Sequence, residues 1–402
     1  MCKCIITVIL TAGIIATNAT PSCRFYDENK NNFVCSPVGT DYELKKGLVS
    51  NQDNVKSISL RGCGITDIDC DAFVGLPMLQ HLDIAENKLQ ELKPCTLVSL
   101  PQLNSLDLSF NKISVLSPGT FDHLNNIEEL YLKGNELRNL QNEIFDKLKK
   151  LNVLDLSNNV IDGSNLSPRI FDNNKIITSL DLSRNDMSRA HENLLQSFQT
   201  LQSLYLDRCF LTRVPSFVTK SNLKTLQQLI LSTNQITNLD DPTSFINMDE
   251  LIMLDFAGNS IESVAENVFT PLRKLKTIVL KHNHLKQIPE KLFQNMPKLV
   301  NIDLSYNDIQ VINLASFRNT PMKNLNLSGN NLTYMPVNFY GTLISFGGKL
   351  KKFLFTNNPW QCACLRDILQ EVKEHNIEYN MTVYDGKLSV CVSDGDFICN
   401  RG

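Results

Sequence analysis

The chain has 402 residues, a formal net charge of −3 and 20% charged residues. So small a net charge gives no reason to expect a nucleic-acid partner, and no Gly-x-Ser-x-Gly, phosphate-binding glycine loop or His-Glu-x-x-His motif points to an enzyme. Length alone would suggest two or three domains, but an internal repeat overrides that expectation because a stack of repeats needs no larger central core as it grows.

Residues 1–19 are expected to be a cleaved signal peptide. They contain Lys3, an apolar run from Ile5 to Ile15, and then Thr17, Asn18 and Ala19. The apolar run is too short to span a membrane comfortably, and no later window offers 18 apolar residues. We therefore expect a soluble, secreted, extracellular protein without a membrane span or a glycolipid anchor.

Residues 20–54 contain Cys23 and Cys35, which bracket a short segment before the first repeat. We expect them to pair and to close an N-terminal cap. An oxidising compartment fits this cysteine use.

The repeat occupies residues 55–357 and is marked by asparagines behind a fixed leucine pattern, L-x-x-L-x-L-x-x-N-x-L. Thirteen repeats start at Val55, Leu79, Leu103, Ile127, Leu151, Ile177, Leu201, Leu226, Leu251, Leu275, Leu299, Met322 and Leu350. The alternating leucines predict one short strand per repeat, stacked as a parallel sheet in a solenoid with α/β character.

Two further recurrences predict buried positions. The asparagines, from Asn87 to Asn358, should bond to backbone groups of their own and the next repeat, and Cys63 and Cys209 fill the same slot as weaker donors. Both cysteines should be free and buried. A phenylalanine about 18 residues into most repeats predicts an aromatic spine on the convex side rather than a ligand site. These are Phe73, Phe121, Phe145, Phe245, Phe269, Phe293 and Phe317.

The other cysteines and the sequons fit a secreted protein. Stacking should bring Cys70 close to Cys95, and we pair Cys362 with Cys391 and Cys364 with Cys399 in a C-terminal cap; metal binding by the two cysteines at 362 and 364 is the rival interpretation. Glycosylation sequons begin at Asn165, Asn326, Asn331 and Asn380. Repeats 5 and 12 are longer than the rest, and we expect surface loops at 163–165 and 341–348.

The chain resembles extracellular leucine-rich repeat proteins of the Toll ectodomain, Slit and acid-labile-subunit type. Residues 358–402, which begin Asn-Pro-Trp-Gln-Cys-Ala-Cys, resemble their C-terminal flanking cap. The resemblance implies that Trp360 covers the last repeat and that a helix spans 365–374. The N-terminal side departs from the family pattern, which commonly has four cysteines. In size, repeat number and the expected lack of a membrane anchor, the chain also resembles small secreted members similar to leureptin, which are insect haemolymph proteins that bind lipopolysaccharide. This resemblance implies an immune role.

The concave face should carry the ligand site, because the variable strand positions project there. Six aspartates at the fifth repeat position form a broken acidic stripe, which we interpret as a polar face that keeps the solenoid soluble. Repeats 7 to 9 interrupt it, and we expect aromatic, apolar and polar side chains on their strands to contact a partner. These are Tyr205, Asp207, Arg208, Phe210, Gln228, Ile230, Ser232 and Met253. The alternative is that such residues merely favour strands.

A second candidate is the basic edge at Lys281, His282 and His284, which could meet a phosphate-bearing ligand or be plain solvated surface. No cofactor or metal is expected. A glycan on Asn326 would close the C-terminal part of the concave face. The sequence thus predicts a secreted, non-enzymatic binding protein of innate immunity, whose ligand is a microbial glycolipid such as lipopolysaccharide or an immune partner protein. An adhesion, guidance or growth-factor-binding scaffold is the alternative.

Overall fold

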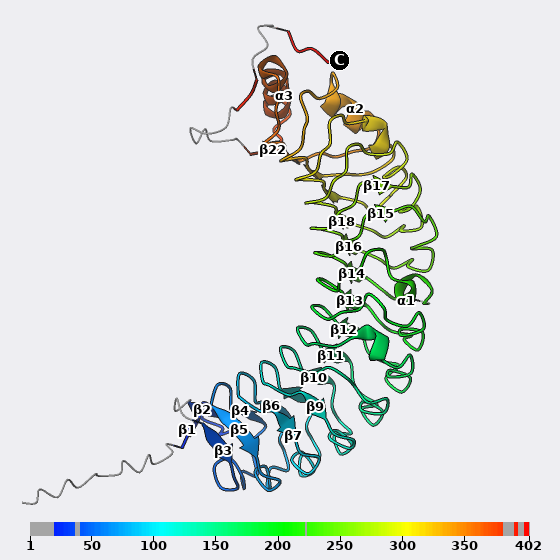
Figure 1. Cartoon of the computed structure of the whole chain (residues 1–402). Coiled ribbons are helices and arrows are strands. Elements are labelled where there is room, and N and C mark those ends of the chain that lie inside the picture. Colours follow the sequence, from blue (N-terminus) through cyan, green and yellow to red (C-terminus); the bar gives the residue numbers. More distant parts are fainter. Residues whose placement is uncertain (1–19, 37–40, 222, 381–389, 393–397, 402) are drawn as a thin grey trace, which may run out of the picture.

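A computed structural model describes residues 20–36, 41–221, 223–380, 390–392 and 398–401. The expected signal peptide, residues 1–19, lies outside the described residues. The chain forms a curved solenoid whose strands line the inner side of the arc (Figure 1). We call each turn of the solenoid a coil.

One 16-stranded sheet forms the concave face, and it confirms the predicted repeat solenoid. Every predicted repeat contributes one three-residue strand, and neighbouring strands are parallel and in register. The strands are β4 (Ser57–Ser59), β6 (His81–Asp83), β8 (Ser105–Asp107), β10 (Glu129–Tyr131), β11 (Val153–Asp155), β12 (Ser179–Asp181), β13 (Ser203–Tyr205), β14 (Gln228–Ile230), β16 (Met253–Asp255), β18 (Thr277–Val279), β19 (Asn301–Asp303), β20 (Asn324–Asn326) and β21 (Lys352–Leu354).

The caps extend this sheet at both ends, which the repeat pattern did not predict. The antiparallel hairpin β1 (Ser22–Phe25) and β2 (Asn32–Ser36) pairs in parallel with β4, and β22 (Glu378–Tyr379) pairs with β21. Disulfides join Cys23 to Cys35, Cys70 to Cys95, Cys362 to Cys391 and Cys364 to Cys399. The sheet thus ends in two short cap strands, β1 and β22, and short edge strands limit pairing with another chain.

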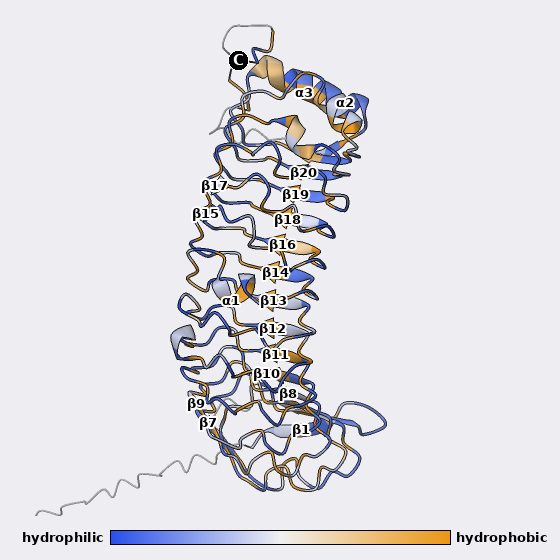
Figure 2. Ribbon diagram, turned by 90° about the vertical axis from the view of Figure 1, so that its right-hand side faces the viewer, coloured by the Kyte–Doolittle hydropathy of each residue, from blue (hydrophilic) through white to orange (hydrophobic). Residues whose placement is uncertain are grey.

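Short elements cross the outer side of the arc (Figure 2). Three two-stranded ladders and several short helices lie there. They are β3 (Tyr42–Leu44) with β5 (Ile65–Ile68), β7 (Glu91–Leu92) with β9 (Val115–Leu116), β15 (Asn238–Leu239) with β17 (Ser263–Val264), the 3-10 helices Gly163–Asn165 and Leu314–Phe317, and the α-helices α1 (Ser216–Thr219) and α2 (Phe339–Ser345).

Two expected loops are wrong in detail. Residues 163–165 form a 3-10 turn because Asp162 caps it through the Ser164 amide. Most of 341–348 belongs to α2, whose buried Phe339 and Leu343 anchor it to the core. The cap helix α3 spans Cys362–Glu374, so it begins three residues before the expected 365–374.

The asparagines form the expected buried ladder, but they bond to the preceding coil and not to the next one. Asn111 Nδ2 donates to Leu108 O of its own coil and to Ile84 O of the coil before, both at 3.0 Å, and its Oδ1 accepts from Leu89 N at 3.0 Å. Cys209 Sγ occupies the same slot and donates to Leu182 O at 3.4 Å. Burial raises the pKa of the Cys209 thiol to about 12, so it stays a neutral donor.

The phenylalanine spine is buried in two stacked rows. Phe121, Phe145, Phe171 and Phe198 form one row with ring centroids 5.3–6.5 Å apart. Phe245, Phe269, Phe293 and Phe317 form the other at 5.8–6.3 Å. Phe171 and Phe198 were missed because inserted residues in their repeats shift them beyond the usual spacing.

Candidate functional site

The concave face is built from the first and third residues of every strand, because the middle residue points into the core. In β13, Leu204 is buried whereas Ser203 and Tyr205 are half-buried. The in-register pairing sets the third residues in one row across the sheet, including Asp181, Tyr205 and Ile230. A ligand on this face therefore meets side chains from several coils at once.

The aspartates in this row have a structural task. In each case Oδ1 accepts a hydrogen bond from the backbone amide two residues later, as in Asp107 to Ser109 N at 2.8 Å and Asp181 to Ser183 N at 2.9 Å. Such side-chain caps are typical of aspartate and asparagine in tight turns. The same bond is made by Asp83, Asp155, Asp255, Asp303 and, with an amide oxygen, Asn326. The acidic stripe is thus explained by the turn that follows each strand.

Tyr205 and Ile230 occupy this position in successive coils and cannot supply the cap. Their side chains forgo a hydrogen bond that contributes about 1 kcal/mol. The turn after Tyr205 is held instead by Ser183 Oγ, which accepts from Asp207 N at 3.2 Å. Two neighbouring departures from a structural preference mark this place as the best candidate for a contact site.

Four of the predicted residues come together on three adjacent strands. Tyr205 lies beside Ile230 and Gln228 lies beside Met253 in the sheet register, and Tyr205 Oη donates to Gln228 Oε1 at 3.5 Å. We call Tyr205, Gln228, Ile230 and Met253 the central patch. It combines an aromatic ring, two apolar side chains and an amide, a mixture suited to a protein partner.

The other four predicted residues lie in the turns beyond the strands, so their expected placement on the strands is wrong. Asp207, Arg208 and Ser232 follow β13 and β14 at the rim of the concave face. Phe210 is 56% exposed and follows Cys209, whose side chain is buried in the core. The reason is that the strand ends at Tyr205 and the chain then turns through left-handed backbone at Arg208 (φ 54°) and Phe210 (φ 58°).

The basic edge is only partly cationic. The His282 ring stacks on Tyr306 with centroids 4.4 Å apart, and His284 Nδ1 lies 3.3 Å from Asp308 Oδ2. Lys281 is half-buried next to them. A carboxylate beside His284 opposes binding of a phosphate there.

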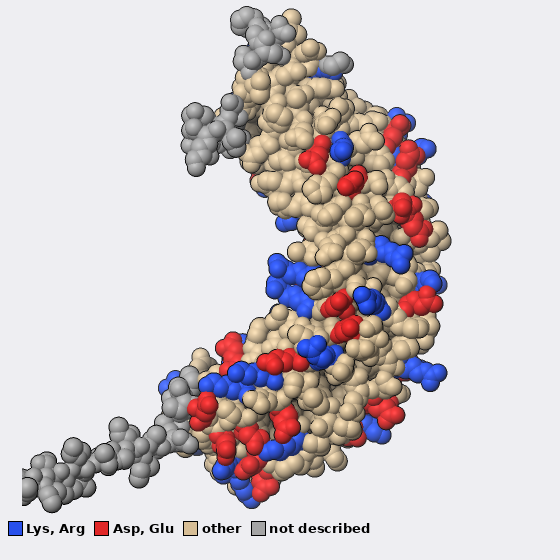
Figure 3. Space-filling model, viewed as in Figure 1, with Lys and Arg blue, Asp and Glu red and all other residues tan. Residues whose placement is uncertain are grey.

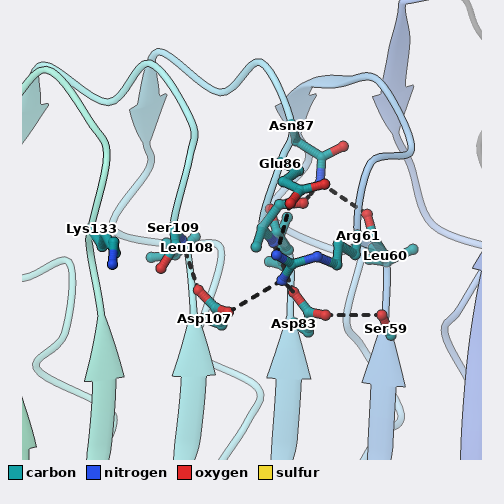
Figure 4. A network of polar contacts seen from close by, with 12 residues as sticks. Ser59, Leu60, Arg61, Asp83, Glu86, Asn87, Asp107, Leu108, Ser109 and Lys133 are labelled. Carbon is teal, nitrogen blue, oxygen red and sulfur yellow. Dashed lines mark hydrogen bonds and ion pairs between the residues drawn. The ribbon is translucent and has the colours of Figure 1, made fainter. Parts of the chain in front are cut away.

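The N-terminal end of the concave face carries an ion-pair network that the sequence did not reveal (Figure 4). Arg61 Nη2 lies 2.8 Å from Glu86 Oε1, and its Nη1 lies 3.8 Å from Asp83 and 3.7 Å from Asp107. One arginine thus joins carboxylates from two following coils. Its only sequence signal is an arginine at a repeat position where other coils often have serine or alanine.

Aromatic residues in two coils lie over glycines of the next coil. A Cβ on Gly134 would come within 2.6 Å of Phe110 Cδ1, and one on Gly329 within 2.6 Å of Tyr306 Cδ1. Phe110 and Tyr306 are 44% and 46% exposed and have positive φ. These contacts explain why glycine follows Phe110 and Tyr306 at the same position of the next coil.

Burial perturbs two carboxylates in the row. It raises the pKa of Asp181 to about 6, against the opposing hydrogen bonds from Ser183, and the charges of Asp155 and Asp207 add to the rise. Burial also raises the pKa of Asp255. Charge near the central patch therefore depends on pH in the weakly acidic range.

An open groove of about 300 Å³ lies on the C-terminal part of the concave face, across β18 to β21. Val279, Asn326, Lys352 and Leu354 contribute to its lining. A glycan on Asn326 would enter this groove. In the described part of the chain, no group of three or more His, Cys, Asp or Glu side chains is placed to hold a metal ion.

The repeat model of the family described as "Leucine rich repeat" matches residues 53–113, 90–137, 101–161, 125–187, 224–285 and 273–332, which together exceed half of the chain. The chain belongs to the leucine-rich repeat family. No curated protein matches it. Among the described residues of this leucine-rich repeat protein, no helix is long and apolar enough to cross a membrane.

Two solved leucine-rich repeat structures share the fold. A leucine-rich repeat protein of Leptospira interrogans has a TM-score of 0.62 and 20% identity over 82% of this chain and 90% of that one. Toll in the Toll–Spatzle complex of Drosophila, described as a hub in development and innate immunity, has a TM-score of 0.51 and 16% identity over 90% of this chain and 64% of that one. At such identities the likeness concerns the fold.

Proposed function

We propose that this protein is a secreted, non-enzymatic recognition protein of innate immunity that binds an extracellular protein through its concave face. The parallel solenoid is a scaffold suited to protein binding, and four disulfides fit an oxidising compartment. The Toll structure with a similar fold is a complex with a protein. That likeness supports a protein partner for this chain.

The central patch carries this proposal. Tyr205 and Ile230 replace the turn-capping aspartate in two successive coils, where the fold alone favours aspartate. Their half-buried ring and aliphatic chain can be buried further by a partner, and tyrosine is enriched among the residues that dominate interface energies. Strands roughly 5 Å apart let one partner segment touch all four residues of the patch.

The decisive test is capture of partners from extracellular fluid by the wild-type protein and by Tyr205→Ala. An interface anchor of this kind typically contributes ~2 kcal/mol, so truncation should weaken binding of the captured partner roughly thirtyfold. The melting temperature should stay unchanged because the side chain points away from the core.

Tyr131→Ala is the matched control, since Tyr131 has the same residue type at the same repeat position three coils away. It should leave binding almost unaffected. Equal capture by wild type and the Tyr205 variant would place the contact site elsewhere.

A microbial glycolipid such as lipopolysaccharide is the second candidate ligand. The groove across β18 to β21 favours it, because apolar Val279 and Leu354 lie there beside the cationic Lys352. If lipopolysaccharide binds there, the Leu354→Asn variant should lose binding to immobilised lipopolysaccharide, whereas the Tyr205→Ala variant should keep it. This difference separates the two candidate ligands.

Secretion is tested by sequencing protein recovered from culture medium. Removal of the leader predicts a mature chain that starts near Thr20.

Glycan mapping of the same material should find Asn165 and Asn331, whose side chains are exposed, more fully occupied than Asn326, whose amide oxygen caps its turn. Recovery only in a salt-washed membrane pellet would contradict the proposal.

A further inference from the structure

The turn after each strand places one residue in left-handed backbone at the rim of the concave face. Its amide donates to a carbonyl of the next coil, as in Arg184 N to Asp207 O at 2.8 Å and Arg208 N to Ser232 O at 3.1 Å. We call this the rim position. Its occupants from the second coil onwards are Glu86, Phe110, Gly134, Asn158, Arg184, Arg208, Thr233, Gly258, His282, Tyr306, Gly329 and Asn357, with φ between 53° and 68°.

Two arginines occupy the rim position in successive coils. Left-handed backbone favours glycine and asparagine, so a long side chain is disfavoured at Arg184 and again at Arg208. Both side chains are exposed, and lysine and arginine atoms gather on the inner edge at the middle of the arc (Figure 3). The two residues lie roughly one strand spacing apart, about 5 Å at the backbone, and like charges at this spacing repel.

Neither charge is well satisfied within the protein. Arg208 Nε lies 3.9 Å from Asp207 Oδ2, and the Arg208 side chain is open to solvent. Exposed pairs of this geometry contribute little. Among the described residues Arg184 has no ion-pair partner. The pair borders the central patch, since Arg208 follows Tyr205 by three residues and Arg184 lies in the preceding coil.

We propose that Arg184 and Arg208 together bind an acidic segment of the protein partner. The inference rests on the proposed function, because the segment is taken to belong to the partner that covers the central patch. A planar guanidinium matches a carboxylate through two parallel hydrogen bonds, and two adjacent carboxylates would remove the repulsion between the arginines. The rim arginines would supply charge selectivity, while Tyr205 and Ile230 supply apolar contact area.

Fluorescence anisotropy with a labelled hexaglutamate peptide tests this inference on the full mature protein. The double variant Arg184→Asn/Arg208→Asn should weaken peptide binding at least tenfold. Wild-type binding should fall as salt is raised from 50 to 200 mM, because exposed charges are screened. Asparagine is native at the rim in Asn158 and Asn357, so the variant should melt at the same or a higher temperature.

Arg213→Asn is the matched control, because it removes one exposed arginine from the same coil as Arg208 but away from the rim position. It should bind hexaglutamate as the wild type does. Arg184→Lys/Arg208→Lys should retain only part of the wild-type affinity. Lysine keeps the positive charge but lacks the planar guanidinium that makes two parallel hydrogen bonds to a carboxylate.

Three outcomes would overturn the inference: no hexaglutamate binding by wild type, equal binding by the double asparagine variant, or tighter binding of phosphatidylglycerol vesicles than of peptide through the same two arginines. None of these outcomes bears on the proposed function, which is tested by comparing partner capture by the wild type and by Tyr205→Ala. Conversely, normal capture by Tyr205→Ala with loss of capture by the arginine variant would move the partner from the patch to the rim.

Discussion

At the scale of single residues, the fold depends on side chains that replace backbone partners. Asn234 shows this most fully. Its Nδ2 donates to Leu206 O, Leu231 O and Ser232 O at 2.8–3.2 Å, and its Oδ1 accepts from Cys209 N and Leu211 N at 2.8 and 3.1 Å. All of these bonds except the one to Ser232 O are buried, so removing the amide leaves buried backbone groups unsatisfied.

We expect Asn234→Ala to lower the free energy of unfolding by ~3 kcal/mol or more, because each buried polar group left without a partner costs about 1–3 kcal/mol. Asn234→Cys should lose less, since Cys209 shows that a thiol fits this slot and donates. Denaturant unfolding measures both. The exposed neighbour Gln235→Ala is the control, and an equal loss there would contradict the role of the slot.

Asp181 gives the protein a pH-dependent stability. Its pKa is raised to about 6 in the folded state from an ordinary value of 3.8, so the folded protein binds the proton more tightly than the unfolded chain. Stability should therefore fall as pH rises from about 4 to about 6, and the loss should persist above that range.

Asp181→Asn tests this behaviour. The amide oxygen can keep the cap on Ser183 N, as Asn326 does for Ser328 N. The variant should gain on the order of 2 kcal/mol at pH 7.5 and almost nothing at pH 4, measured by urea unfolding at both values. The same gain at both pH values would show that the charge is not responsible.

At the scale of elements, the C-terminal cap closes the open end of the core. Trp360 is 2% exposed, and its Nε1 donates to Phe355 O at 2.8 Å. The backbone amide of Tyr340 in α2 donates a hydrogen bond to Glu371 Oε2 of α3 at 3.0 Å. This bond connects the cap to the last long coil. Terminal coils of a solenoid need such cover because their apolar faces have no further neighbour.

Replacing Cys362 and Cys391 by serine should destabilise this cap by ~2–4 kcal/mol, since their disulfide closes a loop with a sequence separation of 29 residues. The expected result is a lower secreted yield and a lower melting temperature. An unchanged yield and melting temperature would mean that Trp360 and α3 suffice to cover the last coil.

At the scale of the whole molecule, the sequence predicts what the repeat period controls. Strand positions, the asparagine slot and most of the spine follow from a residue's place in L-x-x-L-x-L-x-x-N-x-L. The repeat period says little about the segments that connect one strand to the next, so the sequence predicts a loop where α2 forms. It also cannot tell which side chains leave the concave face after the strand, as Phe210 does, or which ones meet between coils, as Arg61 and Asp107 do.

The spine divides the solenoid into two parts. One stacked row ends at Phe198 and the other begins at Phe245, and between them the described residues show no ring contact with the buried Phe217 of α1. Each coil contacts only its neighbours, so cooperativity must pass through every interface in turn. The coil that contains α1 is therefore the place where the two halves are most easily uncoupled.

Phe217→Ala should reveal this boundary. Loss of a buried phenylalanine typically costs about 3–5 kcal/mol, and here the loss falls on the junction between the two rows. We expect denaturant unfolding to change from one transition to two, with hydrogen exchange showing that β4 to β12 and β14 to β21 open separately. Phe145→Ala, in the middle of one row, should lower stability mainly of the N-terminal coils. A single transition that merely shifts in the Phe217 variant would show that the strands couple the halves without help from the spine.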